Sequence, residues 1–598
     1  MLERTLQLKR SHHCGELSLD HVGQTVTLAG WVASRRDHGG VRFIDLRDRY
    51  GLTQIVFDSE HEPTVHQLAD RLRNEYVVTV TGKVTLRPEG SANPHIPTGA
   101  IEIRTTSLII LNEAKPLPFA LDDTITTSET LRLKHRYLDL RRPRMQALLQ
   151  LRSQVSHLVR QYLHANQFIE VETPILTKST PEGARDYLVP SRVNPGEFFA
   201  LPQSPQLFKQ ILMIGGTDRY YQLARCFRDE DLRLDRQPEF TQIDVEMSFV
   251  DQEDIINLIE HMVRLVFKET KNIDLPTPLP RLSFEDAMGR YGTDKPDLRF
   301  DLQLQDLSQF AATCDFKVFR SAVESGGIVK ALVIPGGNDF TRNRIDNLID
   351  TAKEFGAKGL AWVKVNEEGN LDSSIAKFFN AQALREALPS AQPGDLLIFV
   401  ADQAPIVHQV LGRLRLLLGE ELQLVDQNRW EPLWVVDFPM FEYDDAAKRF
   451  VALHHPFTAP HPQDMPLLET DPLQIRTQAY DLVLNGFELG GGSIRIHAPQ
   501  VQSKVFDLLN ISKTEAREKF GFLLDALESG APPHGGIALG LDRLVMLLGK
   551  TESIREVIPF PKTQKAQCLM TEAPSPVTLE QLQELSIRTT AKKPDSPL

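Results

Sequence analysis

The sequence predicts an α+β protein of several domains: a small β-barrel, then an antiparallel sheet with flanking helices, interrupted by an inserted α+β domain. The first observation is length, because 598 residues are too many for one hydrophobic core. The second is that strand-like runs dominate residues 1–112, whereas a long helical pattern and further strand-like runs follow. The third is a change over residues 289–419, where Gly- and Pro-rich turns separate new strands.

The five strand-like runs of residues 1–112 are bounded by Gly, Asp and Pro, and several alternate apolar with polar residues. They are Val26–Val32, Val41–Leu46, Thr53–Phe57, Tyr76–Val84 and Ile101–Ile109. Five strands fit a closed barrel such as the OB-fold, although a β-sandwich fits the same pattern. The two prolines of Lys115–Phe119 then indicate a hinge, assigned to residues 113–136.

The mixed domain is predicted in two parts, residues 137–288 and 420–561. A helical pattern through Leu148, Val155 and Tyr162 precedes the strand-like run Phe168–Val171, which Pro174 ends. Further strand-like runs lie at Phe198–Leu201, Tyr220–Leu223, Phe240–Phe249 and Leu433–Asp437. The inserted domain has such runs at Ile328–Ile334 and Leu396–Val400, and residues 562–598 form a turn-rich C-terminal extension.

Composition limits the class of protein. The net charge of -13 argues against a generally basic nucleic-acid binder, although a local basic or aromatic face can still bind RNA. Four scattered cysteines without C-x-x-C spacing indicate neither a disulfide framework nor a cysteine zinc site. Because no membrane-span-like or signal-like apolar stretch is present, we expect a cytoplasmic protein.

A loop rich in charge, Arg225–Asp231 and Arg236–Asp244, joins two strand-like segments. Alternation places Phe240, Gln242, Asp244 and Glu246 on one strand face. An arginine fork can grip a phosphate and an aromatic ring can stack on a base, so this face suits a nucleotide. A solvated, salt-bridged hairpin is the alternative.

The segment Gly535–Met546 runs from a Gly-rich turn into an apolar helix. Gly540 allows close backbone approach, and Arg543 in the first helical turn would favour an anion there. An ordinary strand-to-helix turn is the alternative. The segment Gly549–Thr551 is no P-loop, because position 544 is leucine rather than the upstream glycine.

Two carboxylates, Asp481 and Glu488, precede a predicted triple-glycine turn and Arg495. They could share magnesium with ATP phosphates, or simply face solvent. His454 and His455 lie in an exposed-looking turn without a third zinc ligand at convincing spacing, and such pairs are more often structural.

Together these segments resemble the three signature motifs of class II aminoacyl-tRNA synthetases. Motif 1 ends at Pro174, motif 2 contains Arg228–Glu230, and motif 3 contains Gly540–Arg543. Their order after a β-barrel matches the aspartate, asparagine and lysine subgroup. The segments Thr180–Tyr187, Gln203–Gln210 and Gly490–His497 closely resemble bacterial aspartyl-tRNA synthetases, and the resemblance covers nearly the whole chain.

The resemblance implies an ATP site in which Arg228 and Arg543 are catalytic. Arg228 would hold the α-phosphate, Glu230 would read the adenine amino group, and Phe240 and Arg543 would sandwich the base. The full implied set is Arg228, Asp229, Glu230, Gln237, Phe240, Glu488, Gly540, Leu541, Asp542 and Arg543, with Asp481 and Glu488 as magnesium ligands.

The implied aspartate site consists of Glu182, Gln206, Lys209, Arg228, Asp244, His454 and Arg495. Glu182 would receive the ammonium, and Lys209 and Arg495 would bind the side-chain carboxylate, which neutral asparagine lacks. Aspartate would attack the ATP α-phosphorus and release pyrophosphate, and the terminal ribose hydroxyl of tRNA would then attack the mixed anhydride. Positioning and electrostatics suffice, without a covalent enzyme nucleophile.

The barrel resembles the family's anticodon-binding domain. Phe43 would stack on an anticodon base and Arg36 and Gln54 would read base edges, although by pattern alone Phe43 is a core residue. His38 and Gly90 match family members that charge both tRNA(Asp) and tRNA(Asn), whereas strictly tRNA(Asp)-specific members tend to have leucine and lysine there. We therefore expect both tRNAs and aspartate as partners, an amidotransferase acting on the second product, a homodimer through motif 1, and neither membrane nor DNA as a partner.

Three rivals stay open: a strictly tRNA(Asp)-specific enzyme, an asparagine- or lysine-specific synthetase, and a non-catalytic tRNA-binding paralogue. Such paralogues commonly lose a motif arginine, whereas Arg228 and Arg543 are both present. An asparagine synthetase of related fold is disfavoured by the N-terminal barrel.

Overall fold

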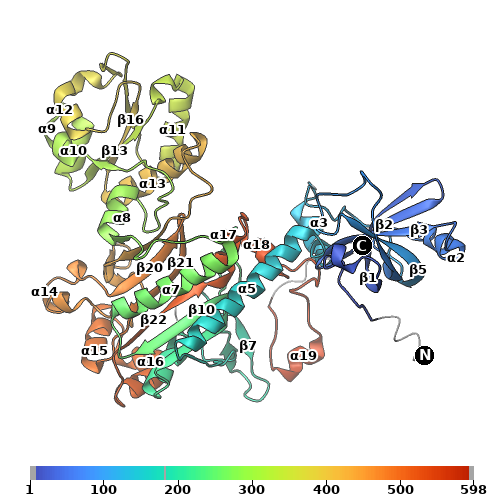
Figure 1. The fold of residues 1–598 in the computed structure, drawn as a ribbon. Helices are drawn as coiled ribbons and strands as arrows, with labels where there is room; N and C mark the ends of the chain where they lie inside the picture. The colour runs from blue at the N-terminus through green and yellow to red at the C-terminus, as the bar shows by residue number, and fades with distance from the viewer. Residues whose placement is uncertain (1–8, 125, 181–182, 591–598) are drawn as a thin grey trace. The chain divides into compact units, whose positions relative to one another are not determined.

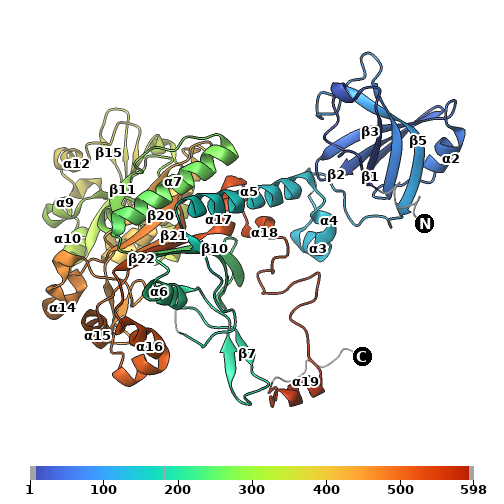
Figure 2. The same ribbon diagram turned by 60° about the horizontal axis from the view of Figure 1, so that its bottom comes forward.

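The computed structural model describes residues 9–124, 126–180 and 183–590, and its contacts divide the chain into two units (Figures 1 and 2). The first unit extends to Gln150 and includes Pro559–Pro561 and Cys568–Ala573. The second unit holds Leu151–Ile558, Lys562–Gln567 and the residues from Pro574. None of the helices in the described part of the chain is long and apolar enough to cross a membrane.

The first unit contains a closed five-stranded barrel in the order β1-β2-β3-β5-β4. Its strands are β1 (Thr25–His38), β2 (Val41–Asp48), β3 (Gly51–Asp58), β4 (Val77–Leu86) and β5 (Ile101–Asn112). Alternate residues of β1, such as Val26, Leu28 and Val32, are buried in the barrel core, which explains the alternation in the sequence. Closure of the sheet excludes the β-sandwich alternative.

Helix α2 (Pro63–Ala69) lies between β3 and β4 in the chain. Two further short helices, α3 (Glu129–Lys134) and α4 (Arg136–Asp139), follow the barrel. Buried Asp139 accepts hydrogen bonds from Arg136 at 2.6 Å and Arg142 at 3.0 Å. The end of the predicted hinge is therefore helical and tied down by a buried ion cluster.

The second unit is built on an eight-stranded sheet in the order β11-β17-β20-β21-β22-β10-β9-β6. The strands are β6 (Ile169–Glu170), β9 (Arg219–Phe227), β10 (Glu239–Ser248), β11 (Arg281–Ser283), β17 (Pro432–Val436), β20 (Ala479–Leu484), β21 (Phe487–Ile494) and β22 (His534–Gly540). All neighbours are antiparallel except the two outermost pairs. The predicted antiparallel sheet is therefore present.

Helices pack on this sheet. The long helix α5 (Pro143–Ala165) lies beside helix α7 (Gln252–Lys271) (Figure 1). The Tyr162 hydroxyl of α5 donates to Leu258 O of α7 at 2.9 Å. Helix α6 (Gln206–Ile214) packs against β9 and β10, and α17 (Leu541–Leu548) packs against β10 and β22. These two short helices carry Lys209 and Arg543 to the middle of the sheet.

Two predicted turns are wrong, because their glycines lie inside strands. Gly490–Gly492 belong to β21, and Gly535 and Gly536 belong to β22. A Cβ on Gly492 would collide with the carbonyl oxygen of Gly536, and a Cβ on Gly536 would collide with the Glu246 carboxylate. Glycine is therefore needed for close packing between strands rather than for a turn; the turn itself is Asn485–Gly486, where φ is 52° and 84°.

The inserted region forms its own sheet, in the order β12-β13-β16-β14-β15. The strands are β12 (Gln305–Asp306), β13 (Ile328–Ile334), β14 (Ala361–Val365), β15 (Leu371–Asp372) and β16 (Leu396–Asp402). Helices α11 (Arg342–Glu354) and α13 (Ala404–Glu421) cover one face, and α9 (Ser308–Thr313), α10 (Lys317–Glu324) and α12 (Ala381–Ala387) cover the other (Figure 1). Covering both faces explains why β13 and β16 are continuously apolar.

The remaining elements connect these layers. They are β7 (Leu188–Pro190), β8 (Phe198–Ala200), α8 (Phe284–Tyr291), β18 (Phe441–Asp444), β19 (Arg449–Ala452), α14 (Leu467–Thr470), α15 (Pro499–Leu508), α16 (Lys513–Leu527), α18 (Ile554–Val557) and α19 (Leu579–Glu584). Single 3₁₀ turns lie at Leu19–His21, Gly337–Asp339, Ala376–Phe378, Pro462–Asp464 and Pro472–Gln474.

Candidate active site

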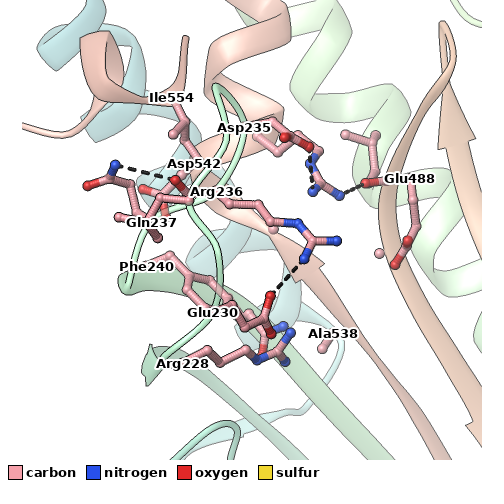
Figure 3. Close-up of a pocket in the computed structure, with 16 residues that line it drawn as sticks. Arg228, Glu230, Asp235, Arg236, Gln237, Phe240, Glu488, Ala538, Asp542 and Ile554 are labelled. Carbon is pink, nitrogen blue, oxygen red and sulfur yellow. Dashed lines mark hydrogen bonds and ion pairs between the residues drawn. The ribbon is translucent and has the colours of Figure 1, made fainter. Parts of the chain in front are cut away.

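A cavity of about 210 Å³ lies between the loop 228–238, strands β10, β21 and β22, and the start of α17 (Figure 3). We call it the nucleotide cavity. Its lining residues are Arg228, Glu230, Leu232, Asp235, Arg236, Gln237, Phe240, Gln242, Glu488, Leu489, Gly490, Ala538, Gly540, Asp542, Arg543 and Ile554. It gathers every predicted ATP-binding residue except Asp229 and Leu541.

The arginines of this cavity are held by neighbouring groups (Figure 3). Arg236 pairs with Glu230 at 2.7 Å, and Arg543 donates to Asp235 at 3.2 Å and to the Glu488 carbonyl oxygen. Phe240 and Arg543 line the same cavity, while the Arg228 guanidinium carbon lies 5.1 Å from the Phe240 ring centroid. Cation–π contact therefore orients Arg228 along the floor.

Three predicted ATP residues have other contacts. Asp229 lies 3.7 Å from Arg185 and Leu541 is buried. The buried carboxylate of Asp542 accepts from Thr241 N at 2.7 Å and from Arg152. Because a buried carboxylate needs such partners, Asp542 serves to join α5, β10 and α17.

A second cavity of about 440 Å³ adjoins the first and shares Arg228, Gln242, Glu488 and Ala538 with it. We call it the amino-acid cavity. Six of the predicted aspartate-binding residues line it: Gln206, Lys209, Arg228, Asp244, His454 and Arg495. The seventh, Glu182, lies outside the described residues.

Four buried charges cluster at the floor of the amino-acid cavity: Lys209, Asp244 and Arg495 line it, and Glu246 lies behind them. Lys209 Nζ lies 2.8 Å from Asp244 and 3.1 Å from Glu246. Arg495 grips Glu246 with Nε at 2.9 Å and Nη2 at 3.1 Å, and its Nη1 donates to Ser493 at 2.6 Å. Burial opposes ionisation of Glu246, but Arg495 and Lys209 outweigh it and lower its pKa to about 2.

Glu246 is the residue that sequence reasoning missed. It does not line the cavity but lies behind both cations. The alternation along β10 already placed it on the face of Asp244, yet no local signal shows that α6 and β21 bring Lys209 and Arg495 to it. Burial raises the pKa of Asp244 despite the nearby Lys209, so the two carboxylates have opposite shifts.

The two histidines are half-buried and line the amino-acid cavity, so the prediction of an exposed turn is wrong. The His454 ring packs edge-on to Phe438 at 4.5 Å, and its Nε2 finds no hydrogen-bond partner among the described residues. Burial and the neighbouring Arg495 lower the pKa of His455 to about 3, and Phe457 N lies 3.3 Å from its Nδ1. His455 is therefore neutral with its proton on Nε2, a donor that sequence reasoning did not assign.

Asp481 and Glu488 lie together on neighbouring strands, and Asp294 lies nearby on the cavity wall. Burial, then Glu488 and Asp294, raise the pKa of Asp481 well above its usual value. Clustered hard oxygens suit a divalent cation, which would relieve this repulsion. Among the residues described, no three His, Cys, Asp or Glu side chains form a ready metal site, so oxygens from a nucleotide would have to complete it.

The predicted anticodon residues gather on the barrel. Arg36 in β1 pairs with Phe43 in β2, and its Nη2 donates to Asp45 at 2.9 Å and Gln54 at 3.2 Å. Phe43 is only half-buried and does not belong to the barrel core, and its ring lies 5.9 Å from that of His38. Gly90 lies in the β4–β5 connection with φ of 79°.

Comparison with known proteins identifies the families that this chain resembles. Residues 128–564 match the family described as tRNA synthetases class II (D, K and N), and residues 26–111 match the OB-fold nucleic acid binding domain. The Aspartate–tRNA(Asp/Asn) ligase of Desulfatibacillum aliphaticivorans is 57% identical over 97% of this chain and 98% of its own length. The chain belongs to the aspartate–tRNA ligases of class II. Such a ligase uses ATP as a substrate, which agrees with the nucleotide cavity.

Other aspartate–tRNA ligases are equally similar. The Aspartate–tRNA(Asp/Asn) ligase of Moorella thermoacetica is 56% identical over 100% of both chains, and the Aspartate–tRNA ligase of Halalkalibacterium halodurans is 55% identical over 98% of this chain and 99% of its own. The asparaginyl-tRNA synthetase of Pyrococcus horikoshii, solved with asparaginyl-adenylate, matches with a TM-score of 0.57 at 20% identity over 93% of this chain and 98% of that one. The predicted fold class and enzyme class are confirmed.

Proposed function

We propose that this aspartate–tRNA ligase charges both tRNA(Asp) and tRNA(Asn), using the amino-acid and nucleotide cavities for adenylate formation. The observation that carries the assignment of the cavities is the pair of buried cations, Lys209 and Arg495, on the floor of one cavity, with Arg228 lining both. Two cavities that share an arginine suit a reaction between a carboxylate and a phosphate.

The proposed first step joins aspartate to ATP. Arg228 stabilises negative charge on the α-phosphate as the aspartate carboxylate attacks it and pyrophosphate leaves. Glu230, Phe240 and Arg543 hold the base. Magnesium, bound by Asp481 and Glu488, would neutralise phosphate charge.

The proposed selection of aspartate depends on Lys209, Arg495 and His455. All three present N–H donors to a side-chain carboxylate. His454 closes over the substrate, and Glu182 receives its ammonium. Leaving a buried charged donor unmet costs about 1–3 kcal/mol or more, which disfavours asparagine by at least roughly fivefold.

Charging of both tRNAs is supported by His38 and Gly90 and by the similarity of this chain to the tRNA(Asp/Asn) ligases of Desulfatibacillum and Moorella. The Halalkalibacterium ligase carries the narrower name and keeps the strict tRNA(Asp) enzyme as the alternative. Phe43 stacks on an anticodon base, and Arg36 and Gln54 read base edges, in this proposal.

A homodimer through motif 1, a cytoplasmic location and domain limits at residues 112, 136, 288, 419 and 561 are also proposed. Analytical ultracentrifugation tests the dimer and limited proteolysis tests the domain limits.

The deciding experiment has two stages. ATP–pyrophosphate exchange with aspartate, asparagine and lysine should proceed with aspartate alone, and a lack of exchange with aspartate would overturn the site. Charging of tRNA(Asp) and tRNA(Asn) transcripts should then succeed with both. Background-level charging of tRNA(Asn) would leave the narrower alternative.

A further inference from the structure

Gln237 is held by the backbone of a residue 325 positions further along the chain. Its Oε1 accepts from Lys562 N at 2.7 Å, and its Nε2 donates to Lys562 O at 3.0 Å. Gln237 is only 5% exposed, and a buried amide left without partners would be costly. We name this pair of hydrogen bonds the Gln237–Lys562 clasp.

The clasp closes the base of the loop 228–238. The residue after Gln237, Pro238, accepts a hydrogen bond from Arg228 N at 2.9 Å. The residue before it, Arg236, pairs with Glu230 at 2.7 Å. Because Arg228 and Glu230 both line the nucleotide cavity, a shift of Gln237 would displace two side chains of that cavity together.

The clasp also determines what Gln237 can offer a nucleotide. Its second Nε2 hydrogen is directed to Arg236 O at 3.3 Å, so both amide hydrogens are engaged. One lone pair of Oε1 is left after Lys562 N has taken the other. Gln237 can therefore present one acceptor, in the orientation that Lys562 imposes.

A third contact reinforces the clasp. Lys562 Nζ lies 3.3 Å from the carboxylate of Glu239, the first residue of β10. Glu239 also pairs with Arg225 of β9 at 3.3 Å. Lys562 is thus tied to the strand pair that carries the loop.

We propose that Lys562 is a positioning residue for adenylate formation, acting through the Gln237–Lys562 clasp to hold the loop 228–238 in its ATP-binding shape. This gives a task to the first residue of the C-terminal extension. The inference rests on the proposed function of the nucleotide cavity. Lys562 itself does not line that cavity.

The test is a double-mutant cycle in the full-length chain, measured by aspartate-dependent ATP–pyrophosphate exchange. Lys562→Pro removes the N–H and the side-chain contact with Glu239 but keeps the carbonyl, and Gln237→Leu removes both hydrogen bonds of the clasp. Loss of one such bond should raise KM for ATP about three- to tenfold in Lys562→Pro, and kcat should fall by a smaller factor because Arg228 is displaced together with the loop. The double variant should have a KM for ATP within about twofold of that of Gln237→Leu alone, because Lys562→Pro then removes only the part-exposed contact with Glu239 in addition.

A matched control lies two residues away. Gln564 is the second residue of a turn closed by Ala566 N and Thr563 O at 2.9 Å, a position that favours proline. Among the described residues, no partner accepts from the Gln564 N–H. Gln564→Pro should therefore leave KM for ATP as in the unaltered chain.

The outcomes separate the clasp from the site itself. The clasp would be overturned if the fold increases in KM for ATP of the two single variants multiplied in the double variant. It would also be overturned if Lys562→Pro and Gln564→Pro had equal KM values for ATP. If Lys562→Pro does not fold, Gln237→Glu replaces it: this variant keeps the acceptor but sets a carboxylate against Lys562 O, and an unchanged KM for ATP would overturn the clasp. Absence of exchange in the unaltered chain would instead overturn the proposed function.

Discussion

Among the buried carboxylates, Glu246 should cause the largest loss of folding stability when its charge is removed. It is fully buried and supports both Arg495, by two hydrogen bonds, and Lys209. Against burial, these cations lower its pKa from 4.5 to about 2, a shift that corresponds to about 3 kcal/mol of stability at pH 7. Replacing Glu246 by Gln removes this charge without changing the shape of the side chain.

The pH dependence has a definite sign. A carboxylate whose pKa is lower in the folded state stabilises above its unfolded pKa, and this stability is lost as pH falls through the folded pKa. The difference between the unaltered chain and Glu246→Gln should therefore be constant above about pH 5 and should fall by roughly half near pH 3.

Thermal unfolding followed by tryptophan fluorescence measures the effect. We expect Glu246→Gln to lower Tm by roughly 3–5 °C at pH 7, because the unfolding entropy of so large a unit is high. The control is Glu260→Gln. Glu260 is also buried, but among the described residues it accepts only from Trp434 Nε1 at 3.0 Å and Leu279 N at 3.2 Å, which an amide oxygen can also do. Equal losses of Tm in the two variants, or a Glu246→Gln effect as large at pH 3 as at pH 7, would refute the reasoning.

Other variants test the two cavities and the barrel. Arg495→Met leaves Glu246 with Lys209 alone and should raise KM for aspartate at least about 100-fold in ATP–pyrophosphate exchange; an unchanged KM would contradict the assignment. Asp481→Asn should raise the magnesium concentration for half-maximal exchange several-fold, and an unaltered magnesium titration would exclude Asp481 as a ligand. Phe43→Ala should raise KM for tRNA roughly 10- to 100-fold while exchange stays unchanged, whereas equal loss of exchange would indicate a folding defect. His38→Leu should reduce charging of tRNA(Asn) more than that of tRNA(Asp), and a parallel decrease would remove His38 from tRNA selection.

Local pattern predicts those elements whose burial is regular. Residues Ile328–Ile334 were predicted as a strand and form β13 over the same range, because helices cover both faces of the inserted sheet. The prediction of a turn at Gly490–Gly492 was wrong, because local sequence rules associate glycine with turns. Their reason is tertiary: three strands approach too closely for side chains.

The candidate site also contains residues that the sequence could assign and residues that only tertiary contacts reveal. Motif residues such as Arg228 and Arg543 could be assigned because the resemblance covers them, and the structure places both in one cavity. Glu246 and Lys562 could not, because their contacts depend on register between distant segments. Lys209 and Glu246 meet only once α6 has packed on β10, and no spacing in the sequence encodes that distance.

The geometry also changes how aspartate selection has to be explained. Two cations and two carboxylates balance in the buried floor, so net charge alone does not attract the substrate. What is unbalanced is hydrogen-bond polarity. Lys209 has three N–H donors and two carboxylate neighbours, and Arg495 has five donors and uses Nε, Nη1 and Nη2 with Glu246, Ser493 and Gly536. The unused donors of these cations and the Nε2–H of His455 all require acceptors. A carboxylate offers acceptors on both oxygens, whereas an asparagine amide would direct its own N–H₂ group at one of these donors, and this mismatch favours aspartate even in a floor without net charge.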